Sequence, residues 1–197
     1  MGAILDPLLL AFVFVGLFTP GPNVIMLTAS GARFGFRASL PHLGGVVLGV
    51  GITAGVTGLG IGALVLASPV LHTILTLAAA AFILHMAWSY WRAAGRPAAQ
   101  AGARPMRLWA AAAFQWINPK VWAVAFAAAA GYGAGLPPVA EGLRLGLVFS
   151  ATNLVVCLFW VAAGTLLTAL LSAPRAWRLF LRAMAVLLAL SAILVFV

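Results

Sequence analysis

Two short segments place a proline beside an asparagine inside runs that are otherwise almost wholly apolar. The first reads FTPGPNVIM, residues 18–26, and the second reads FQWINPKVW, residues 114–122. A proline in a helix interior costs about 3 kcal/mol, because it removes a backbone hydrogen bond and clashes with the preceding turn. We therefore predict a broken helix at each segment. The candidate substrate-binding residues are Pro20, Gly21, Pro22 and Asn23 in the first segment and Asn118, Pro119 and Lys120 in the second.

Such breaks would expose polar groups that suit a small zwitterion. The prolines free the carbonyls four residues before them, which belong to Gly16, Phe18 and Gln115. In a membrane these carbonyls must meet protein, water or substrate, and an exposed carbonyl suits an ammonium group. The N–H groups and positive dipole end of the half-helix after each break suit a carboxylate. The side chains of Asn23 and Asn118 add donors and acceptors. Prolines also occur as simple kinks in membrane helices, so a purely structural interpretation stays open.

Lys120 has two interpretations. A lysine at the centre of a membrane helix costs roughly 2.5–3.5 kcal/mol on insertion scales, so its default role there is functional, and here it would be to bind a carboxylate. Alternatively, residues 104–117 form an interfacial helix, the fourth span begins nearer Val121, and Lys120 extends to the lipid headgroups. The sequence leaves both open.

The composition is that of an integral membrane protein. Apolar residues make up 65% of the 197 residues and charged residues 7%, with a mean hydropathy of +1.17. A soluble domain usually carries roughly 25% charged residues. The net charge of +9 does not indicate nucleic-acid binding, because the basic residues fall in short clusters between apolar runs. The lipid bilayer is therefore a predicted partner and nucleic acid is not.

Counting about 20 apolar residues per span gives six candidate spans, separated by segments with glycine, proline or arginine. They cover residues 4–31, 43–67, 71–91, 108–131, 142–171 and 179–197. Five or seven spans stay open, because the first and fifth runs are long. With a periplasmic N-terminus, nine of the eleven Lys and Arg residues fall on the cytoplasmic side, as the positive-inside rule requires. Both termini of this multi-pass protein are therefore predicted to be periplasmic.

The sequence predicts one transporter domain, residues 1–197, built from two halves. The first half (1–91) and the second half (108–197) hold three spans each and are joined by a cytoplasmic loop (92–107), so they would insert in opposite orientations. Each half begins with a broken helix, and paired interruptions in inverted halves indicate a transporter's binding site. The predicted fold is all-α, a polytopic membrane protein of six transmembrane helices arranged as two inverted three-helix repeats, with helices 1 and 4 broken at the Pro-Asn motifs.

The second span contains three pairs of small residues four positions apart. They are Gly45/Gly49, Gly51/Gly55 and Gly58/Gly62. In lipid such pairs let helix backbones approach closely. We favour tight static packing over a sliding surface.

The other polar residues indicate no cofactor, metal or catalytic site. Asp6 and Glu141 are the only acids, and both are predicted near the outer surface, Asp6 as a helix start rather than a gate. His85 is the histidine well inside a span, with a hydrogen-bonded structural role favoured over a proton relay. Asn153 and Cys157 are candidates to line a cavity or to satisfy neighbouring backbone. The sequence does not indicate the driving ion. Because the chain has few acids, a binding site for multivalent cations is not expected.

The sequence resembles the LysE/RhtB family of amino-acid exporters. The resemblance is carried by residues 18–49, beginning FTPGPNVIM, by LAAAAFILHMAW, residues 77–88, and by INPKVW, residues 117–122. It implies a six-span secondary transporter of the bacterial inner (plasma) membrane that exports small amino acids or their derivatives from the cytoplasm, by alternating access. The stretch LWAAAAFQWINPKVW, residues 108–122, is most similar to the branch that exports cysteine and O-acetylserine. One departure is Phe82, where many members carry a tyrosine in the third span.

Two other classes of function compete with export. A non-transporting membrane scaffold or assembly protein would tolerate loss of Asn23 or Asn118. An intramembrane enzyme needs a nucleophile with a base, a metal cluster or paired acids, and the predicted spans hold no such set. The sequence leaves open which amino acid is carried and whether copies of the chain form a homo-oligomer.

Overall fold

The computed structural model describes residues 6–19, 21–60, 69–95, 104–170 and 173–193. These ranges are helical apart from short connections, so the predicted all-α class is confirmed for them. The helices are α1 (Pro7–Phe18), α2 (Pro22–Phe34), the 3-10 turn η1 (Arg37–Ser39), α3 (Leu40–Gly58), α5 (Pro69–Ala94), α6 (Leu108–Ile117), α7 (Pro119–Gly131), α8 (Pro138–Leu170) and α9 (Pro174–Ile193).

Proline marks where most of these helices begin. It is the first helical residue of α1, α2, α5, α7, α8 and α9, and the second of α3. At the first position of a helix the missing N–H has no intrahelical partner to lose, and the ring already holds the helical φ. The prolines therefore divide an apolar sequence into helices of defined length. The same rule places a helix start directly before Asn23 and directly after Asn118.

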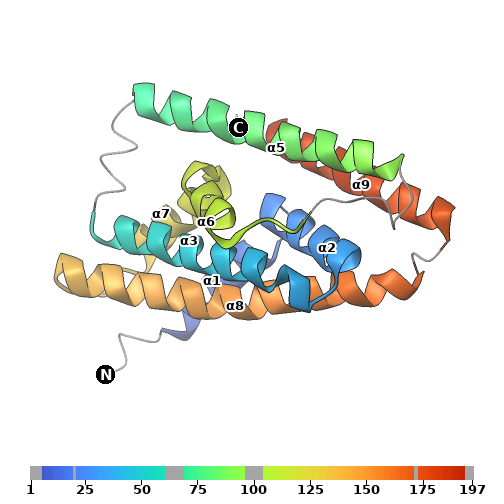
Figure 1. The fold of residues 1–197 in the computed structure, drawn as a ribbon. Coiled ribbons are helices and arrows are strands. Elements are labelled where there is room, and N and C mark those ends of the chain that lie inside the picture. The colour runs from blue at the N-terminus through green and yellow to red at the C-terminus, as the bar shows by residue number, and fades with distance from the viewer. Residues whose placement is uncertain (1–5, 20, 61–68, 96–103, 171–172, 194–197) are drawn as a thin grey trace.

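Figure 1 shows the helices in layers. α5 and α9 lie side by side along one face and pack on each other. α3 and α8 run along the opposite face, and α8 also packs on α2. α6 packs on α3, and α1 contacts both α7 and α8. α2 and α6 lie between the two layers (Figure 1).

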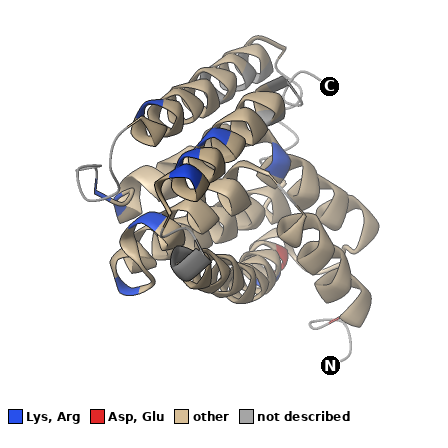
Figure 2. Ribbon diagram, turned by 90° about the vertical axis from the view of Figure 1, so that its right-hand side faces the viewer, with Lys and Arg blue, Asp and Glu red and all other residues tan. Residues whose placement is uncertain are grey.

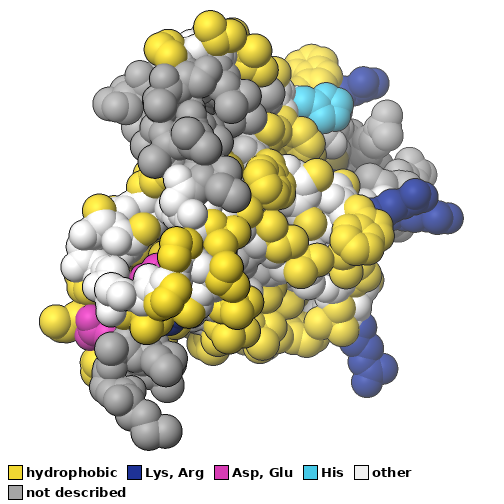
Figure 3. Space-filling view, turned by 90° about the vertical axis from the view of Figure 1, so that its left-hand side faces the viewer, with side chains coloured by type: hydrophobic (Ala, Val, Ile, Leu, Met, Phe, Trp, Pro, Cys, Tyr) yellow, Lys and Arg dark blue, Asp and Glu magenta, His cyan; other side chains and the backbone are white. Residues whose placement is uncertain are grey.

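Several apolar helices and the exposed hydrophobic surface agree with a membrane protein. Among the described residues, Arg37–Gly58 and Pro138–Leu167 are each long and apolar enough to cross a bilayer. α1 and α2 pass the same test as a pair, with a bend of 63° between them. Hydrophobic side chains cover much of the face in Figure 3, and Trp109 is 75% exposed. The helices overlap the six predicted apolar runs with ends shifted by several residues, and the number of spans and their inverted-repeat arrangement stay predictions.

Glycines bring α3 into backbone contact with two neighbours. A Cβ at Gly45 would meet the carbonyl oxygen of Leu108 on α6, and one at Gly49 would lie 2.6 Å from the carbonyl oxygen of Ala112. On the other side, a Cβ at Gly58 would lie 2.8 Å from Cα of Gly142 on α8. These contacts are those of tight packing, which the sequence interpretation favoured. Gly62, the last member of the three predicted pairs, lies outside the described residues.

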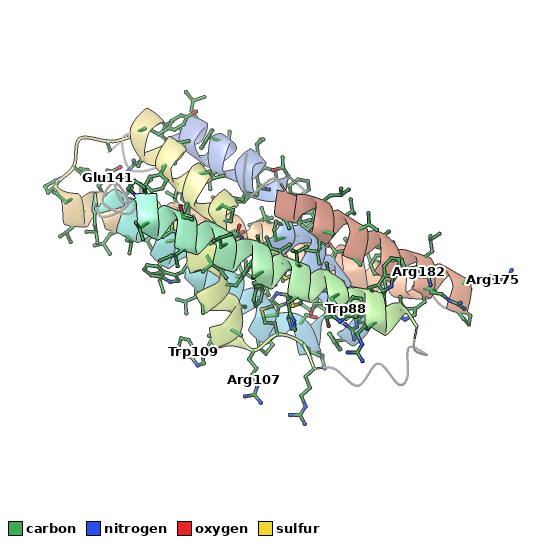
Figure 4. All side chains as sticks on the ribbon, turned by 90° about the horizontal axis from the view of Figure 1, so that it is seen from above. Trp88, Arg107, Trp109, Glu141, Arg175 and Arg182 are labelled. Atoms are coloured by element: carbon green, nitrogen blue, oxygen red, sulfur yellow. The ribbon has the colours of Figure 1, made fainter. Side chains whose placement is uncertain are left out.

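Arg144 forms an ion pair with Glu141 in the first turns of α8 and also reaches the end of α7. Arg144 is 4% exposed. Its Nη2 donates to Oε1 of Glu141 at 2.5 Å and to the carbonyl oxygen of Tyr132 at 2.6 Å, while its Nε donates to Oε2 of Glu141 at 3.1 Å. Tyr132 directly follows α7, so Arg144 caps the C-terminal end of that helix. Glu141 and Arg175 lie at opposite ends of the molecule (Figure 4).

The Glu141→Leu variant is expected to be destabilised by about 3–5 kcal/mol, because it leaves the Arg144 guanidinium buried without its counter-charge. Thermal unfolding of purified protein in detergent, followed by tryptophan fluorescence, measures the effect. The double variant with Arg144→Met should recover most of the loss, since replacing both members of a buried pair is close to neutral. A double variant as unstable as Glu141→Leu alone would contradict this account.

Candidate functional site

The structure brings the two proline-containing segments together. α1 ends at Phe18 and α2 begins at Pro22, while α6 ends at Ile117 and α7 begins at Pro119. Side chains from each segment contact the other, although the two are about a hundred residues apart in the chain. Pro20 lies outside the described residues.

Two of the three carbonyls expected to lose their helical donors find donors nearby. The hydroxyl of Thr19 donates to the carbonyl oxygen of Gly16 at 3.0 Å. The backbone N–H of Asn118 donates to the carbonyl oxygen of Gln115 at 3.3 Å. These two carbonyls are therefore satisfied within their own segments.

A side-chain amide network links the two breaks through Gln115. Gln115 is fully buried. Its Oε1 accepts from Nδ2 of Asn23 at 2.8 Å and from Nδ2 of Asn118 at 3.3 Å. Its Nε2 donates to the carbonyl oxygen of Ala111 at 2.9 Å and to Oδ1 of Asn23 at 3.2 Å. The two asparagines chosen from the sequence thus share one partner, and that partner was not predicted as a site residue.

Lys120 joins the second break to the first. Its Nζ donates to the carbonyl oxygen of Thr19 at 2.5 Å and to the Thr19 hydroxyl at 2.9 Å. Thr19 is the C-cap of α1, so the ammonium group lies where a helix's negative dipole end favours a cation. Gly21 leaves room for this contact, because a Cβ there would lie 3.0 Å from Cδ of Lys120. The half-buried Lys120 therefore contacts α1 as well as facing the cavity described next.

A small cavity lies between the breaks, with a volume of about 20 Å³. The predicted site residues that line it are Gly21, Pro22, Asn23, Asn118 and Lys120; Pro119 does not. Its other lining residues are Leu17, Val24, Leu27, Val121, Asn153, Val156 and Cys157. Asn153 and Cys157 on α8 are the two cavity candidates named from the sequence.

The charge balance of the cavity is positive. Lys120 lines it. So do other residues in the first turns of α2 and α7, namely Pro22, Asn23 and Val121, and the N-termini of these helices have no side-chain cap. The lining residues include no acid. Figure 2 shows basic positions on several helices and few acidic ones. Asp6 caps the start of α1 by accepting from the N–H of Leu8 at 2.8 Å, and Glu141 pairs with Arg144. The cavity therefore favours an anionic group such as a carboxylate.

Two buried side-chain atoms in the cavity wall have no hydrogen-bond partner. They are Oδ1 of Asn118, an acceptor, and Nδ2 of Asn153, a donor. Asn118 is 1% exposed and Asn153 is 3% exposed. A buried polar group without a partner costs about 1–3 kcal/mol, so both atoms favour a polar occupant.

His42 and His85 are not among the residues that line this cavity. His85 is exposed on α5, which gives no support to a hydrogen-bonded structural role. His42 on α3, to which the sequence interpretation gave little weight, is 2% exposed, and neither ring nitrogen has a partner. The described residues contain no cluster of His, Cys, Asp or Glu that could hold a metal ion.

The sequence interpretation did not predict the side chains of Gln115 and Thr19 as part of the site. Gln115 precedes Asn118 by three residues, the spacing that places two side chains on one face of a helix. Thr19 precedes the first proline of its segment. Polar residues within a turn of a predicted break are therefore the signal that would have identified both.

These features are those of a helical membrane protein in which helices that end and begin beside prolines line a cavity with polar residues. Many secondary transporters bind substrate beside interrupted helices. The chain belongs to the LysE type translocator family, whose family model matches residues 14–197. The resemblance inferred from the proline segments is therefore confirmed.

Three curated relatives carry the same name. The chain is 32% identical over 127 residues to a cysteine/O-acetylserine efflux protein of Shigella flexneri serotype 5b, a match that covers 59% of this chain and 62% of the relative. It is 33% identical over 116 residues to the protein of that name in Escherichia coli strain K12, covering 56% of each. The protein of that name in Salmonella typhimurium is 31% identical over 124 residues, covering 59% of this chain and 62% of the relative. The matches thus span about three fifths of the relatives' length. No solved structure matches the chain.

Proposed function

We propose that this protein is a secondary transporter that exports a small amino acid, or a derivative of one, from the bacterial cytoplasm. The observation that carries the proposal is the meeting of the two broken segments at one polar cavity, through Lys120 with Thr19 and through the Asn23–Gln115–Asn118 network. Membership of a translocator family supports it. A scaffold has no need of buried polar groups without partners, which cost stability.

The chemistry of the cavity favours a zwitterion with a small uncharged side chain. The uncapped ends of α2 and α7 and the ammonium group of Lys120 suit a carboxylate, and the free acceptor on Asn118 suits an ammonium group. The remaining wall is apolar, with Leu17, Val156 and Cys157 among its residues. The relatives' names lead us to propose cysteine and O-acetylserine as the first candidates.

Export by alternating access would have the broken helices move between inward-open and outward-open forms. A volume of about 20 Å³ holds about one water molecule. An amino acid is larger than a water molecule, so the cavity must widen to bind substrate. We propose that the two inverted halves of the six-span arrangement, with both termini periplasmic, provide this movement.

The Asn118→Ala variant is expected to lower export by about tenfold or more, because it removes a cavity-lining amide and a partner of Gln115. Bacterial cells would express the wild type or the variant at matched membrane levels, with serine and cysteine supplied as dipeptides. Mass spectrometry of the medium measures the exported amino compounds. The Thr57→Val variant is the control, because Thr57 is buried but its hydroxyl donates within its own helix, to the carbonyl oxygen of Thr53.

Equal media from wild-type and empty-vector cells under every loading condition would favour the scaffold alternative. A passive channel can be distinguished from a transporter, because a channel never moves substrate against a concentration gradient. Export into medium that already contains the substrate in excess would therefore indicate a transporter.

A further inference from the structure

The unpartnered atom of the Asn118 amide is its oxygen, an acceptor, and not its nitrogen, a donor. Asn118 lines the cavity, and its Oδ1 is buried without a hydrogen-bond partner. A side-chain amide can offer either its oxygen or its nitrogen to a ligand, depending on which way it is turned. The neighbours of Asn118 decide this orientation.

The orientation follows from one backbone carbonyl. The carbonyl oxygen of Ala111 accepts only donors, so Gln115 must turn its Nε2 toward it, at 2.9 Å. Oε1 of Gln115 then faces Asn118, and Asn118 must offer Nδ2 to it, at 3.3 Å. Turning the Asn118 amide over would bring two oxygens together. Oδ1 of Asn118 is therefore the end of the amide that stays unpartnered in the cavity-lining residue, as a result of contacts that begin at the helix backbone.

Asn23 strengthens the same arrangement. Its Nδ2 donates to Oε1 of Gln115 at 2.8 Å, and its Oδ1 accepts from Nε2 of Gln115 at 3.2 Å. Gln115 thus has both ends of its amide engaged, and it is fully buried. Neither asparagine can turn over without loss of a hydrogen bond to it.

We infer that Gln115 is a positioning residue that holds the Asn118 side-chain oxygen as the acceptor for the substrate's ammonium group. Asn153, whose buried Nδ2 is the other unpartnered polar atom of the cavity wall, supplies a donor for the carboxylate. This inference rests on the proposed export function and adds a specificity rule to it. The transported compound must carry a free amino group, and acylation of that group must abolish recognition.

Two isomers provide a matched pair of probes. O-acetyl-L-serine keeps its ammonium group, whereas N-acetyl-L-serine carries the same acetyl group on nitrogen and has no charge there. Their formulas are identical, so size does not distinguish them. The assay belongs in mildly acidic buffer, where the acetyl group does not migrate from oxygen to nitrogen.

The experiment is uptake of each labelled isomer into proteoliposomes that contain the purified full chain and are preloaded with unlabelled O-acetyl-L-serine. The wild type is expected to prefer O-acetyl-L-serine by about tenfold or more, the size of one lost hydrogen bond to a charged group. Asn118→Ala should remove this preference. Gln115→Met should reduce it, because the Asn118 amide is then free to turn, while Thr57→Val should retain it.

The ratio of the two isomers' uptake rates distinguishes a positioning role of Gln115 from a folding role. A purely structural defect lowers both uptake rates together and leaves their ratio unchanged. Equal uptake of the two isomers by the wild type would overturn the inference while leaving export standing, and it needs no variant to fold. A preference that survives in Asn118→Ala would also overturn it. Uptake of neither isomer nor of any other amino acid would instead contradict the proposed function.

Discussion

Replacing Lys120 with methionine is expected to reduce transport by about ten- to hundredfold. The change removes the cavity's positive charge and leaves the carbonyl oxygen of Thr19 without its ammonium donor. A hydrogen bond to a charged group contributes about 1.5–3 kcal/mol, and each 1.4 kcal/mol is a factor of ten. Initial rates of O-acetyl-L-serine uptake into proteoliposomes, measured over a range of concentrations, give KM and the maximal rate for each variant.

Two further variants separate the roles of Lys120. Thr19→Val removes only the hydroxyl contact and should have a small effect. Lys120→Arg keeps the charge but replaces a compact ammonium group by a planar fork, so it should recover part of the activity. A raised KM in Lys120→Met would indicate carboxylate binding. A lower maximal rate with unchanged KM would indicate that Lys120 acts through α1. Wild-type values for both parameters would contradict any role in transport.

Enlarging Gly31 or Gly164 is expected to prevent α2 from packing on α8. A Cβ at Gly31 would meet the carbonyl oxygen of Val161, and one at Gly164 would meet the carbonyl oxygen of Thr28. The opposing atoms belong to helix backbones, which cannot rotate away as a side chain can. Gly31→Val and Gly164→Val should therefore each cost about 3 kcal/mol or more, at the upper end of overpacking effects.

Size-exclusion chromatography and thermal unfolding in detergent measure this loss. Gly131→Ala is the matched control, because nothing lies within 4 Å of a Cβ at that position near the end of α7. It should unfold at the wild-type temperature or slightly above it, since alanine favours a helix more than glycine does. Gly164→Val protein with wild-type stability would show that α2 and α8 can separate without cost.

The fold class could be predicted because its determinants are local. The apolar runs are long enough to cross a bilayer, and this chain has too few polar residues to shield them from water. Proline acts on its own turn of helix, so the ends of α1 and α6 and the starts of α2 and α7 lie at the predicted segments. The site residues of those segments are near one another in the structure, but their roles stay predictions.

What joins the two segments depends on contacts between residues far apart in the chain. No local sequence pattern indicates that Lys120 donates a hydrogen bond to Thr19. Nor does one indicate that the Gln115 side chain lies between those of Asn23 and Asn118. Gln115 was noticed for its carbonyl, but its side chain carries the network. The burial of Arg144 was missed for the same reason, because a short loop turns it back onto the end of α7.

The small volume of the cavity also bears on how a cell keeps its ion gradients. An ion crosses a membrane protein readily only along a continuous path of water, since stripping its hydration costs several kcal/mol even inside a protein. A space that holds about one water molecule is too small to contain such a path. In the conformation described we therefore expect no ion to pass through this cavity, so copies of the protein can stay in the membrane without discharging its potential by this route.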